Sequence, residues 1–510
     1  MKKLWLLFPV LFAVIFVYLF KSQQAGVNVL LFNLILIAGL SVSGRMEIHN
    51  RLQLLLSAGA LISSFMVLLY GSSMAMAGNV FSLILLMGVV ADNRIILLLN
   101  GFTASVYAIA SAPFYYLAQI FNSHANKSSG RRIARFILVF IAPLLVLFLF
   151  ILLYANASPF FNKFTGNFML HFRKFLEFIY EFVSPDTFWI FVGGLLISLG
   201  FLYGKSNRLL VFFSEEKGND LFRLRKRYHG RTTSLKTEYR SGIVLLVLLN
   251  VLIAIMNVLD IYNVWFFFEW NGDFLKQFVH EGTWLLIFSI IISIAIVLYY
   301  FRGNLNYYPR RRLLLSLAIL WMAQNALLVF SVGIRNMWYI QHFNLAFKRI
   351  GVYAFLLLTL FGIATVMFKI LNRKSHQYLF HYNGIAAYVI LISLGFFNWD
   401  KVIATYNIRH ADTAFFHPEF MASLNSSALP ELQQSLLVIG KIEQQQFNKF
   451  DFARSYMPFG EYENIVTQRC NDFIAGYPLL SWQGWNFADY QTYRTLQRAN
   501  GNNHFPEKIR

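Results

Sequence analysis

Apolar runs separated by short polar connections fill most of the chain up to residue 398. Each run approaches the roughly 20 residues that an α-helix needs to cross a hydrocarbon layer about 30 Å thick. The candidate membrane spans are residues 4–20, 27–43, 52–71, 74–91, 95–119, 136–155, 187–204, 242–263, 284–301, 313–334, 350–371 and 379–398. We therefore predict an all-α integral membrane protein, a bundle of about 12 transmembrane helices within a range of about 11 to 13.

The pattern divides the chain into four segments. Residues 1–121 hold N-terminal transmembrane helices, and residues 122–240 hold further transmembrane helices with a basic loop at 205–240. Residues 241–398 form a transmembrane core. Residues 399–510 have no membrane span, and we predict there a mixed or mostly helical C-terminal tail outside the membrane.

Three stretches outside the spans have helical patterns. In the tail, residues 430–447 begin with Pro430 at a first-turn position, and residues 461–475 form a second candidate helix. Residues 156–186 separate an apolar side from a charged side, as the sequence shows at Phe172, Phe175, Leu176, Ile179 and Phe182 against Arg173, Glu177 and Glu181. This separation favours an amphipathic helix in the membrane interface, with an ordinary packed connector as the alternative.

Composition supports a membrane protein and argues against nucleic acid. The chain is 57% hydrophobic and 13% charged, whereas a soluble chain is about 25% charged. The net charge of +20 lies in short loops between apolar runs, and the tail is nearly neutral. That distribution is typical of membrane proteins with positive loops on the cytoplasmic side, so the predicted partner is the lipid bilayer and no nucleic acid.

The basic loops also predict an orientation. Two spans separate each basic cluster from the next, and the clusters lie at residues 131–135, 205–240, 302–312 and 373–374. All four then share the cytoplasmic side, and the tail lies outside. Placing Lys2 and Lys3 in the cytoplasm disagrees with this count by one crossing. Either an early segment does not cross fully, with 95–119 as the weakest because of Asn100 and Pro113, or the N-terminus lies outside.

Polar side chains gather where apolar helices least tolerate them. They are Asn250, Asn257, Asp260, His280, Glu281, Gln324, Arg335 and Arg349. Gln324, Ser331 and Arg335 share one helix face. If consecutive spans alternate in direction, the charged members lie at similar depth, and we expect Asp260 to pair with Arg335 or Arg349 because an unpaired charge in hydrocarbon costs about 3 kcal/mol or more.

Two interpretations of this polar cluster stay open. It forms a polar vestibule that binds an ion, a lipid headgroup or a small solute, or it is interhelical pairing at headgroup depth. Asn250 and Asn257 fit hydrogen bonds between helices. Neither interpretation needs a catalytic residue.

Sequence motifs for known chemistry are absent. No histidine follows His280-Glu281 at zinc-helix spacing, and no phosphate-binding glycine loop or dinucleotide fingerprint occurs. Cys470 is the single cysteine, and no Cys/His cluster has metal spacing. We therefore predict no catalytic residue, no cofactor and no metal. The connection at 21–26 contains no carboxylate, which disfavours enzymes that act on lipid-linked sugars.

Three stretches resemble one bacterial membrane protein family. They are Leu248 to Asp260 with the aromatic loop after it, Phe278 to Leu285 around His280-Glu281-Gly282, and Gln324 to Ile350. The family is a group of multi-pass proteins catalogued as domain of unknown function 4173. His280 stands where the family has arginine, and Asn344 and Ala346 stand where it has glycine and threonine. The resemblance, over residues 241–400, implies bacterial origin and a membrane location and no reaction.

These observations favour a non-enzymatic protein of the bacterial inner membrane that acts in envelope signalling or assembly. Its partner would be an envelope protein bound through the extracytoplasmic tail, and no particular oligomeric state is predicted. A transporter or permease for a small solute or ion is the first alternative. A membrane enzyme with a lipid substrate and with Glu281 or His280 as acid or base is the second.

Overall fold

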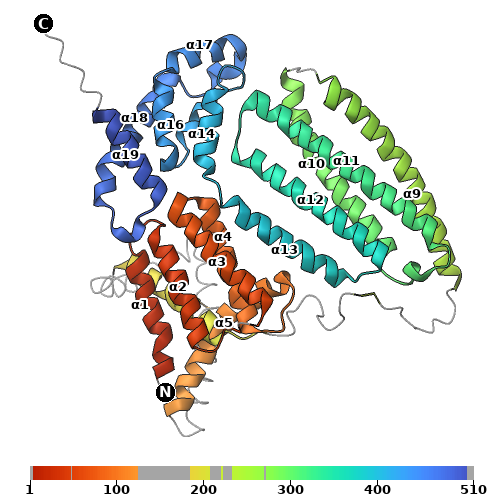
Figure 1. Cartoon of the computed structure of the whole chain (residues 1–510), viewed down its shortest axis with the longest axis horizontal. Coiled ribbons are helices and arrows are strands. Elements are labelled where there is room, and N and C mark those ends of the chain that lie inside the picture. The colour runs from red at the N-terminus through yellow and green to blue at the C-terminus, as the bar shows by residue number, and fades with distance from the viewer. Residues whose placement is uncertain are drawn as a thin grey trace, which may run out of the picture. The chain divides into compact units, whose positions relative to one another are not determined.

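Helices make up all regular elements in the part of the chain that the computed structural model describes, apart from one bridge between Asp220 and Lys374 (Figure 1). The described residues are 4–47, 49–124, 147, 184–206, 220–221, 232–268 and 272–501. The all-helical prediction is thereby confirmed for these residues. The predicted amphipathic helix at 156–186, up to residue 183, and the predicted span at 136–155, apart from residue 147, lie outside them.

The chain forms two compact units. Unit 1 comprises residues 1–69, 76–212 and 480–486, and unit 2 comprises residues 70–75, 213–479 and 487–510. These units divide the chain differently from the four predicted segments. In particular, most of the predicted tail belongs to the same unit as the predicted transmembrane core.

Unit 1 contains the N-terminal helices. They are α1 (Phe8–Phe20), α2 (Val27–Val42), most of α3 (Arg51–Tyr70) and α4 (Ser73–Ala91), α5 (Leu98–His124) and α8 (Pro185–Tyr203). Helix α8 runs antiparallel to α1, because the Ser198 hydroxyl donates to the Pro9 carbonyl at 3.0 Å while Gly194 faces the ring of Phe16. Pro185 stands in the first turn of α8, where its missing N–H costs no hydrogen bond.

Helix α5 lies at the end of unit 1 where α1 begins. The connection before α5 lies at that end, since the Asn50 side chain donates to the Asn93 carbonyl at 3.1 Å and Arg45 donates to Leu202. Further along α5, the Tyr116 hydroxyl donates to the Leu6 carbonyl at 2.7 Å. The start of α5 and its second half therefore lie at one end of the unit.

Unit 2 begins with a row of long helices, green to teal in Figure 1. They are α9 (Thr232–Asp260) with the π-helical turn η4 (Ile261–Phe266), α10 (Gly272–Tyr300), α11 (Arg311–Phe343), α12 (Phe347–Asn372) and α13 (His376–Leu394); the short η5 (Asn304–Tyr307) joins α10 to α11. Helix α11 packs against α9, α10 and α12, and α13 packs against α12. Fully buried side chains such as Leu246, Ile290 and Met322 fill the space between these helices.

The tail residues described are helical. They form α14 (Trp399–Arg409), α15 (Pro418–Ala422), η6 (Ser426–Ala428), α16 (Leu429–Leu436), α17 (Ile439–Lys449), η7 (Asp451–Ser455), α18 (Phe459–Gly476), η8 (Tyr477–Leu479), η9 (Trp482–Gly484) and α19 (Phe487–Gly501). The stretch predicted as one helix at 430–447 is two helices, because the chain turns at Leu437 and Val438. The tail has its own core, with Tyr462 and Leu432 fully buried.

The membrane-length helices are fewer than predicted. Six described helices are long and apolar enough to cross a membrane, or seven if the bent pair α13 and α14 forms one span. The apolar helices Phe8–Phe20 and Val27–Val42 have 13 and 16 residues, which at 1.5 Å per residue falls short of about 30 Å. Helix α10 has 29 residues, but its side chains are described only from Leu285 to Tyr300. Helix α5 is long but carries Asn100 and Pro113, and it is not among the six.

Candidate functional site

The end of α9 departs from α-helical geometry beside α11. After Asp260 the chain makes the π-helical turn Ile261–Phe266. Two tryptophans hold this turn: Trp338 donates its indole N–H to the Val264 carbonyl at 2.9 Å, and Trp265 donates to the Ser331 hydroxyl at 3.3 Å. Single π-turns inside longer helices are frequent at functional sites, so this turn marks the region for closer description.

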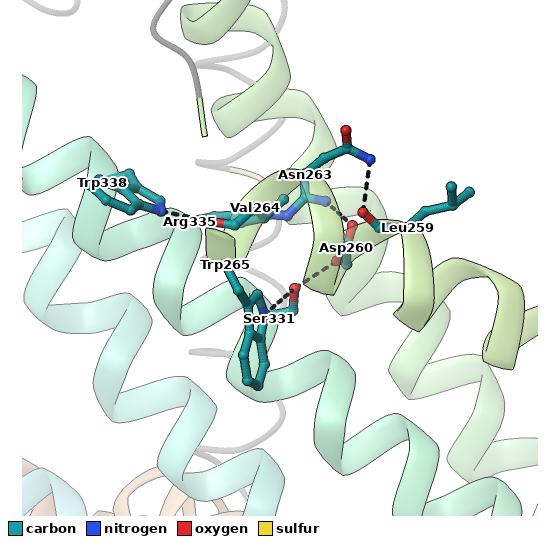
Figure 2. A network of polar contacts seen from close by, with 8 residues as sticks. All are labelled: Leu259, Asp260, Asn263, Val264, Trp265, Ser331, Arg335 and Trp338. Carbon is teal, nitrogen blue, oxygen red and sulfur yellow. Dashed lines mark hydrogen bonds and ion pairs between the residues drawn. The ribbon is translucent and has the colours of Figure 1, made fainter. Parts of the chain in front are cut away.

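Asp260 and Arg335 form a buried ion pair next to the turn (Figure 2). An Nη atom of Arg335 lies 2.5 Å from Oδ1 of Asp260, and the two side chains are 3% and 5% exposed. The other carboxylate oxygen accepts a hydrogen bond from the Ser331 hydroxyl at 2.7 Å. Both oxygens of Asp260 are thus engaged by α11, which is how a carboxylate is retained in an apolar interior.

A ladder of amides extends the contact between α9 and α11 away from the ion pair. Gln324 donates its side-chain amide to Oδ1 of Asn250 at 2.7 Å, and Asn250 donates to the Leu317 carbonyl at 3.1 Å. Between these two amides and the ion pair, Asn257 donates to the Gln324 carbonyl at 3.1 Å. These residues therefore hold helices together in the structure, and whether any of them also binds a ligand stays a prediction.

Arg349 lies apart from this network. It opens α12, donates from an Nη atom to the Phe343 carbonyl at 2.7 Å, and places its guanidinium over the ring of Tyr339 at 4.5 Å. Within the described residues no carboxylate lies within ion-pair distance of it. Of the two pairings expected for Asp260, the structure shows the one with Arg335.

His280 and Glu281 lie in α10, but their side chains are outside the described part of the chain. Their membership in the polar cluster stays a prediction. The structure therefore brings together Asn250, Asn257, Asp260, Gln324 and Arg335 along α9 and α11, and it leaves Arg349 on a different contact.

A cavity that the sequence did not reveal lies beside Arg349. Its volume is about 330 Å³, and it is a half-open cavity lined by the connection from α11 to α12 and by the tail. Its lining residues are Phe343, Asn344, Leu345, Ala346, Phe347, Lys348, Arg349, Asn407, Phe415, His417 and Phe420. The available sequence signal was the run Phe415-Phe416-His417, which is unusually aromatic for an exposed loop, but its neighbours come from distant positions.

Hydrogen bonds between the tail and the α11–α12 connection shape this cavity. Asn407 of α14 accepts from the Leu345 N–H at 2.8 Å and donates to the Leu345 carbonyl at 3.0 Å. The Phe415 N–H donates to the His342 carbonyl at 2.7 Å, and the Asn344 amide donates to the Phe415 carbonyl at 3.1 Å. Side-chain and backbone hydrogen bonds therefore join the tail to the connection between α11 and α12, two helices of membrane length.

His417 is the titratable tail residue at the cavity. Burial lowers the pKa of its imidazole, and the Glu419 carboxylate, 3.0 Å away, partly offsets that effect. Glu419 also accepts a hydrogen bond from the Met457 N–H at 2.9 Å, so both of its oxygens are engaged. The cavity lining thus combines aromatic surface with an arginine, a lysine and a histidine, and it includes no carboxylate.

A metal centre has no basis among the described residues, since no three His, Cys, Asp or Glu side chains there are grouped to hold an ion. The polar groups of this site can bind anions, donate hydrogen bonds and join helices.

No curated protein and no solved structure matches the chain. A family match does exist, and it spans residues 7–435. It is to a different family from domain of unknown function 4173, so that specific resemblance is not confirmed. The matched residues include the ion pair, the amide ladder and all the tail residues that line the cavity. Since the match covers most of its length, the protein belongs to the family described as Domain of unknown function (DUF4153).

Proposed function

We propose that this protein is a multi-pass protein of the bacterial cytoplasmic membrane, with a helical tail on the outer side, and that it acts without catalysis in envelope assembly or signalling. The observation that carries the proposal is the fixed joint between the tail and the α11–α12 connection. The Asn407 side chain forms hydrogen bonds with both the N–H and the carbonyl of Leu345 there. A tail held this way transmits the position of the membrane helices to whatever the tail binds.

The course of α5 supports this orientation. A helix that begins and continues at the end of unit 1 where α1 starts does not cross the membrane. The basic cluster at 131–135 then lies on the same side as Lys2 and Lys3, as the positive-inside rule requires. The proposal has eleven crossings. They are the six membrane-length helices, α13, the helices α1, α2 and α10, which are not among those six, and the predicted span at 136–155, which lies outside the described residues apart from residue 147.

A contact within unit 1 points the same way. The Val27 N–H donates to the carbonyl of Trp485 at 3.0 Å, so tail residues 480–486 lie at the connection between α1 and α2. With Lys2 and Lys3 in the cytoplasm, this connection is on the outer side. The tail segment that contacts it is on the outer side too.

The buried ion pair favours a structural role over transport. Asp260 has both oxygens engaged by α11, in a geometry that joins two helices. The permease alternative needs this pair to open to a solute, and the adjacent π-helical turn is the feature that would permit it. Replacing both partners by apolar residues separates the alternatives, because a structural joint survives the double replacement and a solute site does not.

Topology is tested with paired reporters fused after Arg510, one active only outside the cytoplasm and one active only inside. We expect activity from the outside reporter alone. Activity from the inside reporter contradicts the proposal. A second pair of fusions, after residue 128, tests α5 separately, and there the inside reporter is expected to be active.

The non-catalytic role is tested by complementation of a deletion strain under envelope stress. We expect rescue by the wild type and by Glu281→Gln and His280→Gln, and no rescue by a chain that ends after Leu394. Loss of rescue in Glu281→Gln or His280→Gln, at normal protein levels, favours the enzyme that acts on a lipid.

A further inference from the structure

Arg349 is a half-buried cation that lines a half-open, mostly apolar cavity, and no carboxylate among the described residues lies within ion-pair distance of it. Arg335, near the end of the preceding helix, has Asp260 at 2.5 Å. The described partners of the Arg349 guanidinium are the Phe343 carbonyl and the ring and hydroxyl of Tyr339, none of which carries a full negative charge. Guanidinium groups at such positions are strong ligands for carboxylate and phosphate because they present several donors in one plane.

The cavity beside Arg349 has the size of a ligand pocket. About 330 Å³ lies within the range of about 300–1,000 Å³ that small-molecule pockets occupy. Its walls are mostly side chains without polar atoms, among them Phe347, Phe415 and Phe420. An apolar chain therefore fits the walls, and an anionic group fits the end where Arg349 and Lys348 lie.

One buried acceptor in the lining has no described partner. Asn344 uses its amide N–H to bind the Phe415 carbonyl, while its Oδ1 is buried and accepts no hydrogen bond. Its backbone has φ of 64°, in the left-handed region that asparagine tolerates better than most residues. This oxygen has less than 1 Å² exposed, so a molecule in the cavity does not reach it while Asn344 keeps this conformation.

The location in the fold selects the kind of molecule. The cavity lies where α11 ends at Phe343 and α12 begins at Phe347, two helices that are long enough to span a membrane. Such a position is at the depth of lipid headgroups. We propose that this cavity binds an anionic phospholipid, whose phosphate contacts Arg349 and whose acyl chain lies along the aromatic walls.

The binding proposal depends on the proposed function only for the leaflet from which the lipid comes, the outer one. It is tested in detergent micelles, where orientation in the membrane does not matter. A failure of binding and a failure of the topology are therefore separate results.

The experiment uses the full chain, purified in micelles, and a phosphatidylglycerol that carries a photoactivatable group in its acyl chain. Crosslinks are mapped by mass spectrometry. We expect them in the peptides that contain Phe343–Phe347 and Phe415–Phe420. Phosphatidylcholine with the same chain serves as the neutral probe, and its yield at these peptides should be about tenfold lower.

Arg373 supplies a matched control. It lies at the other end of α12 and also stacks on a tyrosine, Tyr307, at 5.0 Å. We expect Arg349→Gln to lower the phosphatidylglycerol yield about tenfold, Arg349→Lys to keep most of it, and Arg373→Gln to leave it unchanged. Equal yields for the two lipids, or for Arg349→Gln and Arg373→Gln, overturn the proposal.

A second variant covers the case in which Arg349→Gln does not fold. Ala346 lines the cavity in an extended conformation, with φ of −149°, that any side chain adopts. Ala346→Phe fills the cavity and leaves Arg349 in place. We expect it to remove the crosslinks at both peptides; crosslinks that persist at wild-type yield overturn the proposal.

Discussion

Two joints in unit 2 each contain an arginine, and they are closed in different ways. At the joint between α9 and α11, Arg335 meets Asp260, and Ser331 occupies the second carboxylate oxygen. At the joint between the α11–α12 connection and the tail, Arg349 meets a backbone carbonyl and a tyrosine ring. At the first joint the two charges pair with each other, whereas at the second a cavity adjoins Arg349 and no described carboxylate lies within ion-pair distance of it.

The source of the counter-charge separates a structural charge from one that is available to a ligand. A charge whose counter-charge comes from a neighbouring helix contributes to the geometry of the fold. A charge such as that of Arg349, which lines an aromatic cavity and has no described carboxylate beside it, is available to bind an anionic ligand. The two cases cannot be distinguished by the residue type alone.

The largest effect is expected from breaking the first joint. Asp260→Leu or Arg335→Met leaves the remaining charge buried without its counter-charge, which should cost about 3–5 kcal/mol of unfolding free energy. The double variant should cost less than either single one, because no charge is then left. Thermal unfolding of the purified protein in micelles measures all three.

The exposed pair of Lys374 and Asp220 is the control for that experiment. Its atoms lie 2.6 Å apart, but Asp220 is 64% exposed, so Asp220→Ala should cost at most about 1 kcal/mol. For Asp260 and Arg335, a double variant less stable than both single variants would show that their ion pair contributes stability that apolar packing does not replace.

The next largest effect is expected at the second joint. Asn407→Leu keeps the side-chain size but leaves the N–H and the carbonyl of Leu345 without their partners, at about 2–4 kcal/mol for the two groups. Limited proteolysis should then cut the chain between α13 and α14 faster than in the wild type. Thr405→Val, an exposed change on the same helix, should leave the cleavage rate unaltered.

A third joint, in unit 1, is made of backbone groups and has no arginine. A Cβ atom at Gly26 would lie 2.3 Å from the Trp485 carbonyl oxygen. Gly26→Ala should therefore push residues 480–486 away and cost about 1–3 kcal/mol. Hydrogen exchange of the Val27 amide should speed up.

Gly193 provides the comparison for Gly26. It lies in α8 with nothing near its Cβ position, so Gly193→Ala should leave exchange at Val27 as it is. Equal exchange at Val27 in the two variants would mean that the tail segment does not depend on the close approach at Gly26.

The smallest effect concerns the tail core rather than a joint. Cys470 is buried, and burial raises the pKa of its thiol to about 11. Since the thiolate is the reactive form, a maleimide at pH 7 should modify it only on unfolding. The variant with Cys470→Ser and Asn471→Cys moves the thiol to an exposed neighbour, which should react within minutes. Rapid modification of native Cys470 would contradict the packing of the tail core.

The sequence predicted the first joint well because it depends on local rules. Spans that alternate in direction place Asp260 and Arg335 at similar depth, and helical spacing places Ser331 and Arg335 on one face. Few opposite charges share both the membrane depth and the facing side of a given charge in an apolar helix. The choice between Arg335 and Arg349 needed the structure, because it depends on how α11 and α12 rotate about their axes.

The second joint could not be predicted in the same way. It unites residues 343–349 with tail residues 407–420, and no periodicity connects two segments so far apart in the sequence. The course of α5 is intermediate: Asn100 and Pro113 marked it as the weakest span, but only the contact of Tyr116 with Leu6 shows where it goes.

The contact between Val27 and Trp485 has a consequence for the order in which the protein is made. The ribosome completes the hairpin of α1 and α2 long before it adds Trp485, so during synthesis the Val27 N–H has to find another acceptor. The connection between α1 and α2 therefore reaches its final hydrogen bonding only after most of the chain has been synthesised.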